Sequence, residues 1–102
     1  MSNDYSNIDL VINTEKKRFE LQINNHTAFI EFALKNGDTI FLRDSQVPKE
    51  LQGKGVGSAL VEKVLNYIKG NGYVLAPICP FVKKYLIIHP EWQSILAVGY
   101  QL

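Results

Sequence analysis

Three glycines at alternate positions, Gly53, Gly55 and Gly57, constrain the fold of this chain more than any other feature. They follow an apolar run typical of a strand and open a stretch with the apolar period of a helix. A backbone without Cβ atoms can adopt positive φ and come close to a ligand. Consecutive N–H groups in such a turn, together with those of the first helical turn, bind phosphate well. The stretch therefore predicts an anion-binding turn; the alternative is a tight turn that binds nothing.

Two common nucleotide-binding patterns fit this turn poorly. The Walker spacing Gly-x-x-x-x-Gly-Lys-Ser/Thr is absent from the chain. The dinucleotide fingerprint needs a third glycine where Ser58 stands, and it needs an acidic residue about 20 residues further on, which is missing from 73–78. A phosphate-bearing ligand of another kind is favoured.

The apolar period of the chain changes at these glycines. Before them, apolar and polar residues alternate as in half-buried strands, and Asn24-Asn25 and Asn36-Gly37 are typical hairpin turns. After them, the pattern predicts a helix of about 13 residues and then an interior strand parallel to the strand before the glycines. The predicted fold class is α/β (α+β): an antiparallel meander of about four strands, a parallel strand–helix–strand unit and a short last helix. We predict strands over 8–13, 18–24, 27–34, 39–47 and 73–78, helices over 56–69 and 81–88, and one or two turns over 91–97.

Composition excludes several classes of protein. A net charge of +1 gives no bulk electrostatic reason to bind nucleic acid or a membrane surface. No apolar run approaches the ~18 residues of a membrane span, and the polar first residues do not resemble a secretory signal. One cysteine precludes an internal disulfide, and no histidine has metal-ligand spacing with it. We expect one cytoplasmic domain over 1–102, with 1–7 flexible and no metal.

The glycine turn resembles the pyrophosphate loop of the GNAT superfamily of acyl-CoA-dependent N-acetyltransferases, with Gln52, Gly55 and Gly57 in the Gln/Arg-x-x-Gly-x-Gly/Ala positions. Val47-Pro48 resembles the superfamily's splayed fourth strand. The segments 77–82 and 89–92 resemble a branch of about 100 residues, the short GNAT-like N-acetyltransferase domain family. The resemblance is specific over 47–92 and general before it. It implies a GNAT-like mixed sheet and transfer of acetyl from acetyl-CoA to an amine.

The resemblance also implies which residues hold coenzyme A. The backbone of Gln46 and Val47 would pair with the pantetheine arm, and the Val47 N–H would lie near the thioester carbonyl, where it would stabilise an oxyanion. Phe81 would pack on the arm or in the core. Lys83 and Lys84 would meet the 3′-phosphate; solvated helix lysines are the alternative. The implied pyrophosphate donors are the backbone N–H groups of Gln52, Gly53, Lys54, Gly55, Val56, Gly57 and Ser58.

Cys79 and Tyr85 are the candidate catalytic residues. Cys79 precedes a helix start, where the dipole favours a thiolate, and the short family places a cysteine beside the thioester. It would either accept the acetyl group or only line the pocket. Tyr85 matches by approximate spacing the general acid of larger relatives; the alternative is an aromatic residue that anchors the helix. The acceptor amine needs a base, for which Glu31, Asp44, His26 or a water chain is a candidate.

Only about a dozen residues follow Pro90, whereas larger GNAT enzymes continue with strands that shape the acceptor site. The acceptor groove would therefore be open, or completed by a partner protein or a second copy of the chain. The alternative function is a non-catalytic acyl-CoA-binding module that acts as a sensor or an interaction partner. A nucleic-acid-binding domain is disfavoured by the near-neutral charge.

Overall fold

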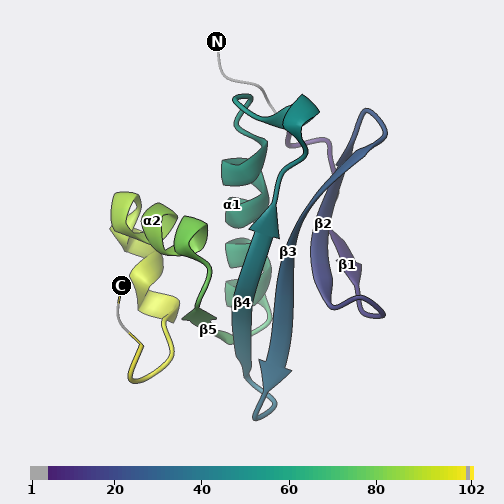
Figure 1. Ribbon diagram of the computed structural model, residues 1–102. Coiled ribbons are helices and arrows are strands. Elements are labelled where there is room, and N and C mark those ends of the chain that lie inside the picture. Colours follow the sequence, from purple (N-terminus) through teal and green to yellow (C-terminus); the bar gives the residue numbers. More distant parts are fainter. Residues whose placement is uncertain (1–4, 101) are drawn as a thin grey trace.

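A computed structural model describes residues 5–100 and 102 of the chain (Figure 1). Strands β1 to β4 form an antiparallel meander, and β5 pairs parallel to β4, in the sheet order β1-β2-β3-β4-β5. This arrangement confirms the predicted mixed sheet with its strand–helix–strand unit and short last helix. The elements are β1 (Val11–Asn13), β2 (Arg18–Ile23), β3 (His26–Lys35), β4 (Thr39–Gln46), the 3₁₀ turn η1 (Lys49–Leu51), α1 (Val56–Gly70), β5 (Val74–Pro77), α2 (Pro80–Ile88) and the 3₁₀ segment η2 (Pro90–Ile95).

The two hairpins are made by the residues that the sequence indicated. Asn24 and Asn25 join β2 to β3 with φ of 50° and 66°, and Asn36 and Gly37 join β3 to β4 with φ of 58° and 75°. Asparagine and glycine tolerate this left-handed region, which matches the twist of a tight hairpin. The hairpins therefore fix the register of β2, β3 and β4.

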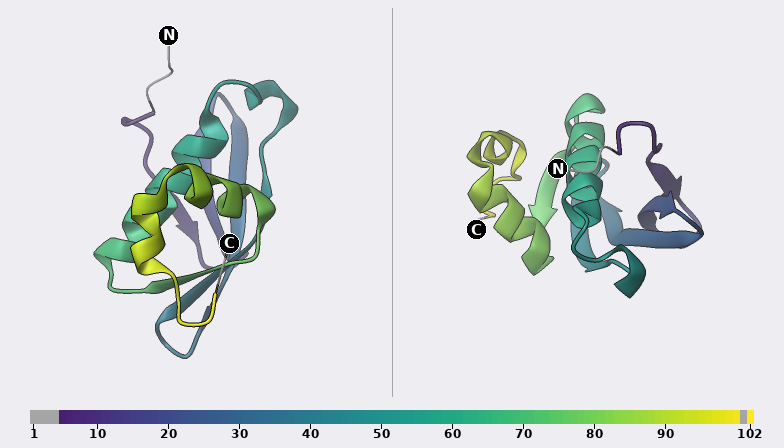
Figure 2. Two further views of the ribbon diagram at one scale, coloured as in Figure 1. Left: turned by 90° about the vertical axis from the view of Figure 1, so that its left-hand side faces the viewer. Right: turned by 90° about the horizontal axis from the view of Figure 1, so that it is seen from above.

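Helix α1 covers one face of the sheet, whereas α2 and η2 lie beyond β5 at the sheet's edge (Figure 2). The buried side of α1 is the apolar stripe that the sequence predicted. On the sheet, Phe19, Leu21, Ile30 and Leu42 meet that stripe and are fully buried. The stripe consists of Val56, Leu60, Val61, Val64, Leu65 and Ile68, each at most 1 % exposed.

Two predicted strands differ from the structure. Of the predicted strand 8–13, only β1 (Val11–Asn13) pairs with another strand, β2. The strand predicted as interior over 73–78 is β5, and it lies at the edge of the sheet. Its apolar run has a different cause: the segment after η2 covers its outer edge, where Leu96 pairs with Leu75 and the Ala97 N–H donates to the Leu75 carbonyl at 2.8 Å. None of the helices in the described residues is long and apolar enough to cross a bilayer.

Part of the segment 1–7, expected to be flexible, is held in place. Residues 1–4 lie outside the described residues. The Tyr5 hydroxyl donates to the Lys54 carbonyl at 2.7 Å, and its ring packs against the core. The flexibility expected over 1–7 stays a prediction, and in this structure Tyr5 contacts the glycine turn.

Strand β4 parts from β5 halfway along its length. The parallel ladder runs from Thr39 opposite Val74 to Leu42 opposite Pro77, and the Ile78 and Cys79 N–H groups both donate to the Leu42 carbonyl at 2.9 Å. Beyond Leu42, β4 pairs only with β3. The parting coincides with a β-bulge, since Arg43 has no opposite residue on β3. A bulge bends its strand, which gives the parting a local physical cause.

Candidate functional site

The glycine turn runs from η1 into α1 with backbone conformations that only glycine adopts easily. Gly53 has φ of 76° and Gly55, the residue before the helix, has φ of 78°. Gly57 lies within the first helical turn and has a different role. A Cβ at Gly57 would lie 2.9 Å from Phe81 Cζ and 3.5 Å from Val47 Cγ2. Its missing side chain thus lets α1 approach both β4 and α2.

The turn presents a set of unpartnered backbone donors. Among the described residues, no acceptor bonds to the N–H groups of Gly53, Gly55, Val56, Gly57 or Ser58, since the first helical bond is from Ala59 to Gly55. The positive end of the helix dipole lies at the same place. This combination suits an anionic group, as the sequence predicted for these five residues.

Gln52 is engaged in a way that the sequence did not indicate. Its own N–H already donates to the Lys49 carbonyl at 3.2 Å, so the amide expected as a phosphate donor is occupied in this structure. Its side-chain Nε2 donates to the Val47 carbonyl at 3.0 Å. Gln52 therefore fastens the turn to the end of β4.

Val47 directly follows β4, where the strands have parted. Its carbonyl accepts from Gln52, while no acceptor within the described residues bonds to its N–H. The preceding residue, Gln46, is exposed and pairs with Phe29 on β3. The unpaired Val47 N–H is thus available to a carbonyl that enters between β4 and α2.

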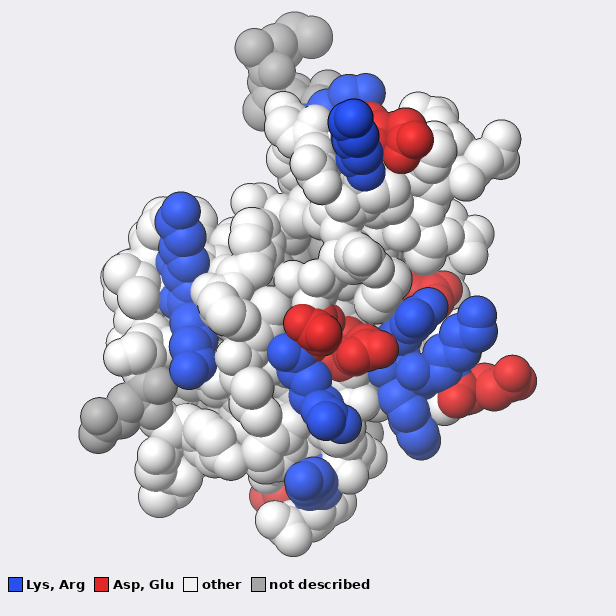
Figure 3. Space-filling model, viewed as in Figure 1, with Lys and Arg blue, Asp and Glu red and all other residues white. Residues whose placement is uncertain are grey.

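Two hollows meet at this place. The outer one, of about 290 Å³, lies over the glycine turn. The inner one, of about 50 Å³, lies between β4 and α1. Val47, Gly57 and Phe81 line both hollows and so form the wall between them. Figure 3 shows uncharged surface between the charged side chains over η1 and the lysines over α2. The remaining residues that line the outer hollow are Leu51, Gln52, Gly53, Gly55, Val56 and Ser58. The remaining residues that line the inner hollow are Ile30, Ser45, Leu60 and Val61.

Cys79 lies directly beyond the parting of the strands and is only 2 % exposed. Its Sγ donates to the Ser45 Oγ at 3.2 Å, so the thiol bridges from the start of α2 to the parted half of β4. Ser45 lines the inner hollow, which places the thiol one hydrogen bond from it. The structure thus brings Cys79 to the candidate site and adds Ser45, which the sequence did not single out.

Tyr85 is turned toward another contact. Its ring packs on His89 with centroids 4.3 Å apart, and the side chain is buried. Burial, and then the charge of Glu62 and a hydrogen bond to it, raise the pKa of the Tyr85 phenol. Tyr85 lines neither hollow. The geometry favours the anchoring alternative over the role of general acid.

This contact predicts a pH effect on stability. Because folding raises the Tyr85 pKa, the unfolded chain releases this proton at lower pH than the folded chain does. The contribution of the neutral phenol is complete below about pH 10 and is lost as pH rises through the folded pKa. We expect Tyr85→Phe to lose less stability than the wild type between pH 9 and pH 11, measured by urea unfolding. The control is Tyr100→Phe at the surface; equal losses in all three proteins would contradict the expectation.

The base candidates and the helix lysines stand apart from the two hollows. His26 Nδ1 lies 3.8 Å from Glu50 Oε1 near η1. Glu31 is directly opposite Asp44 across the β3–β4 ladder. Neither the three candidates nor Lys84, which is exposed on α2, lines either hollow. The structure thus brings none of the three side-chain candidates to the hollows, and the water chain stays a prediction.

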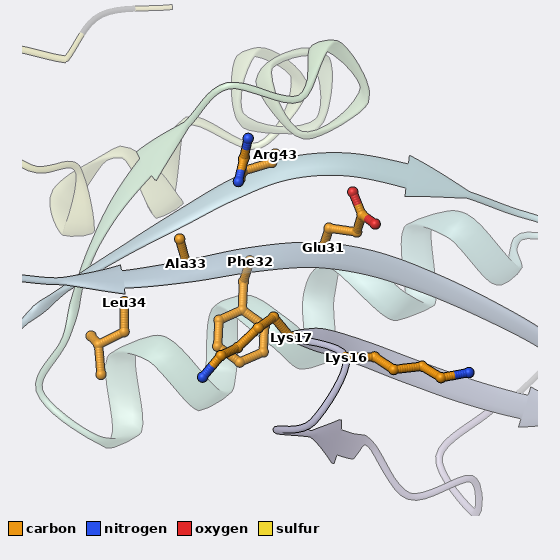
Figure 4. A pocket seen from close by; sticks show the side chains of 7 residues that line it. All are labelled: Lys16, Lys17, Glu31, Phe32, Ala33, Leu34 and Arg43. Carbon is orange, nitrogen blue, oxygen red and sulfur yellow. The ribbon is translucent and has the colours of Figure 1, made fainter.

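A further hollow of about 450 Å³ lies elsewhere along β3. Figure 4 shows that its side chains do not converge: Glu31, Ala33 and Arg43 lie on one side of β3, while Phe32 and Leu34 lie on the other. None of its lining residues belongs to the glycine turn. In the part of the chain that the structure describes, no three His, Cys, Asp or Glu side chains gather as a metal site requires.

The fold and the parted strands define the class of protein. The model of the GCN5-related N-acetyl-transferase family matches residues 18–95, so the chain belongs to that family. A solved structure has the same fold: the solution structure of a GCN5-like protein from Staphylococcus aureus that is provisionally assigned as an N-acetyltransferase. It is 24 % identical, with a TM-score of 0.68 over 90 % of each chain.

Proposed function

We propose that this chain binds acetyl-CoA and catalyses transfer of its acetyl group to an amine. The observation that carries the proposal is the set of N–H groups of Gly53, Gly55, Val56, Gly57 and Ser58, which have no acceptor among the described residues and open onto a hollow leading to the parting of β4 and β5. These donors fit a pyrophosphate, since they combine free amides with a helix N-terminus. Membership of an N-acetyltransferase family supports the same donor.

Each part of the site has a role in this proposal. The amine nitrogen attacks the thioester carbonyl carbon and forms a C–N bond. The C–S bond then breaks, and the sulfur leaves with the electron pair as the CoA thiolate. The glycine turn holds the pyrophosphate, and Phe81 and Val47 flank the pantetheine arm. The free Val47 N–H would donate to the oxyanion that forms on the thioester carbonyl during the reaction. Removing one such donor typically lowers kcat by about 10²–10³-fold. Water carries the proton from the amine, and Lys84 is available to the 3′-phosphate.

Cys79 has two roles open to it. As a thiolate it would attack the thioester carbonyl, accept the acetyl group as CoA leaves, and pass it to the amine. Alternatively its thiol lines the pocket while the amine attacks directly. Its burial and its bond to Ser45 favour the second role, because nucleophilic cysteines are usually partly exposed and lie in electropositive surroundings.

Calorimetric titration tests the proposal on the unmodified chain. We expect CoA and acetyl-CoA to bind at least about tenfold more tightly than NAD or ATP, a difference of about 1.4 kcal/mol. Cys79→Ala should keep CoA binding, because the thiol contacts no residue of the glycine turn. Failure of CoA to bind would refute the proposal.

Transfer is then measured with acetyl-CoA and a panel of amines. If Cys79 only lines the pocket, Cys79→Ala should retain activity, and intact-mass spectra of the wild type should show no acetylated cysteine. An acetyl adduct that disappears in Cys79→Ala would establish the covalent role instead. CoA binding without transfer to any amine would favour the non-catalytic acyl-CoA-binding module, and partner proteins or a second copy would then be sought to complete the acceptor site.

A further inference from the structure

Strand β3 continues past the start of β2 and leaves one of its edges open there. The ladder between them ends with Arg18 opposite Glu31, whereas β3 runs on to Lys35 (Figure 4). The hollow of about 450 Å³ lies along this stretch. We propose that the open edge binds a short C-terminal segment of a partner protein, which pairs with β3 as an added strand. This interaction does not involve the glycine turn and does not depend on the proposed function.

The backbone of Leu34 faces the open edge. On that side of β3 the Phe32 N–H donates to the Lys17 carbonyl at 2.9 Å, and every second residue of a strand directs its backbone groups to the same side. The Lys35 carbonyl accepts from the Asp38 N–H in the hairpin on the other side, as this alternation requires. In the described part of the chain, no backbone group bonds to the Leu34 N–H or carbonyl. An added peptide strand would supply both partners.

The hollow has an apolar side and a charged side. Phe32 and Leu34 lie on one side of β3, and Ala33 and Arg43 lie on the other (Figure 4). Leu34 is 48 % exposed, so its side chain has free area for an apolar contact. The side chains of an added strand alternate between the same two sides. We therefore expect a partner segment with apolar residues toward Leu34 and acidic residues toward Arg43.

The charges favour one occupant and one orientation. Lys16, Lys17 and Arg43 line the hollow, and Glu31 is the acidic residue in the lining. The two lysines directly precede β2, so they lie where the open edge ends. A segment that pairs antiparallel with β3, in line with β2, ends at these lysines and brings its terminal carboxylate to them. A second copy pairing edge to edge would bring the same cations together, which is unfavourable.

Fluorescence anisotropy with a labelled pentapeptide tests the inference. The probe alternates valine and glutamate, carries fluorescein on its N-terminus and has a free C-terminal carboxylate. We expect the wild type to bind it with a Kd below about 1 mM, and at least about tenfold more tightly than a peptide with lysine in place of glutamate. A C-terminal amide should weaken binding at least about twofold, because it removes the carboxylate from the two lysines.

Two lysine substitutions test the end of the edge. Lys16→Gln combined with Lys17→Asn should weaken binding of the glutamate peptide at least about fivefold. Asparagine is chosen because Lys17 has φ of 57°, which asparagine tolerates. The matched control is Lys83→Gln combined with Lys84→Gln, a pair of neighbouring lysines on α2 that does not line the hollow. Equal losses in the two double variants would overturn the inference.

Leu34→Pro tests strand pairing itself. It removes the outward N–H and should abolish binding, whereas Leu34→Val keeps that N–H and should bind within about threefold of the wild type. Should Leu34→Pro unfold, hydrogen exchange of the wild type decides: the peptide should protect the Leu34 amide and leave the Gly53 amide unchanged. Protection at Gly53 in place of Leu34, no binding at 1 mM peptide, or a dimer that forms through this edge without peptide would each overturn the inference.

Discussion

Replacing Gly57 with valine is expected to weaken CoA binding at least about tenfold, or about 1.4 kcal/mol, while the chain stays folded. A Cβ at this position already lies 2.9 Å from the Phe81 ring, and the two valine methyl groups would fill the passage between Phe81 and Val47. The fold tolerates the change because the nearest contact is the far end of a half-exposed ring that can rotate away. Calorimetry with CoA measures the loss.

Gly70→Val is the matched control for this change. Gly70 is the last residue of the same helix, and no atom lies within 4 Å of a Cβ built there. We expect CoA affinity within about twofold of the wild type in Gly70→Val, and Gly57→Ala should fall between the two variants. If Gly57→Val binds CoA like the wild type, the arm does not pass between Phe81 and Val47. If Gly70→Val loses as much as Gly57→Val, the effect is not local.

Much of the fold could be predicted because its signals are local. The hairpins depend on asparagine and glycine at single positions, and the helix stripe depends on a period of 3.6 residues. The glycine turn could be found for the same reason, since φ near +77° at Gly53 and Gly55 is a property of the residue type. Helices and turns of this kind are set by neighbours in sequence, so the sequence alone indicates them.

The finer geometry of the site depends on a bulge that the alternation pattern does not show. With regular alternation after Ile40 and Leu42, Asp44 would have pointed toward α1. The extra residue at Arg43 shifts the register, so Ser45 faces the inner hollow instead and Asp44 is exposed. A one-residue shift reverses every later side chain, and nothing within the strand marks it. Ser45 was missed for this reason.

Long-range contacts account for the remaining differences. The burial of β5 at the sheet's edge depends on Leu96 and Ala97, which lie far from it in sequence and cover its outer side. The engaged amide of Gln52 depends on η1, a short turn without a sequence signature. Tyr85 was placed by spacing along its own helix, whereas its hydroxyl contact comes from Glu62 on α1. Each case requires knowledge of which elements pack together.

The largest effect on stability is expected from Phe19→Ala, which should lower the free energy of unfolding by about 3–5 kcal/mol. Phe19 is fully buried, its ring stacks on Phe32 at 4.4 Å between centroids, and it meets the edge of Tyr67 at 5.5 Å. It therefore joins β2, β3 and α1 at one point. Such a loss is a large part of the 5–15 kcal/mol of a typical domain and should lower the melting temperature by roughly 10 °C or more.

Phe81→Ala makes the same chemical change at a ring that is 41 % exposed, and it separates core packing from ligand binding. We expect it to cost about 1–2 kcal/mol in urea unfolding, because only part of the ring is buried. Its effect should appear instead in the titration of acyl-CoA. Phe19→Ala at a temperature where it is folded should bind CoA with near-normal affinity, since Phe19 lines neither hollow. Equal destabilisation by the two substitutions would show instead that Phe81 belongs to the core.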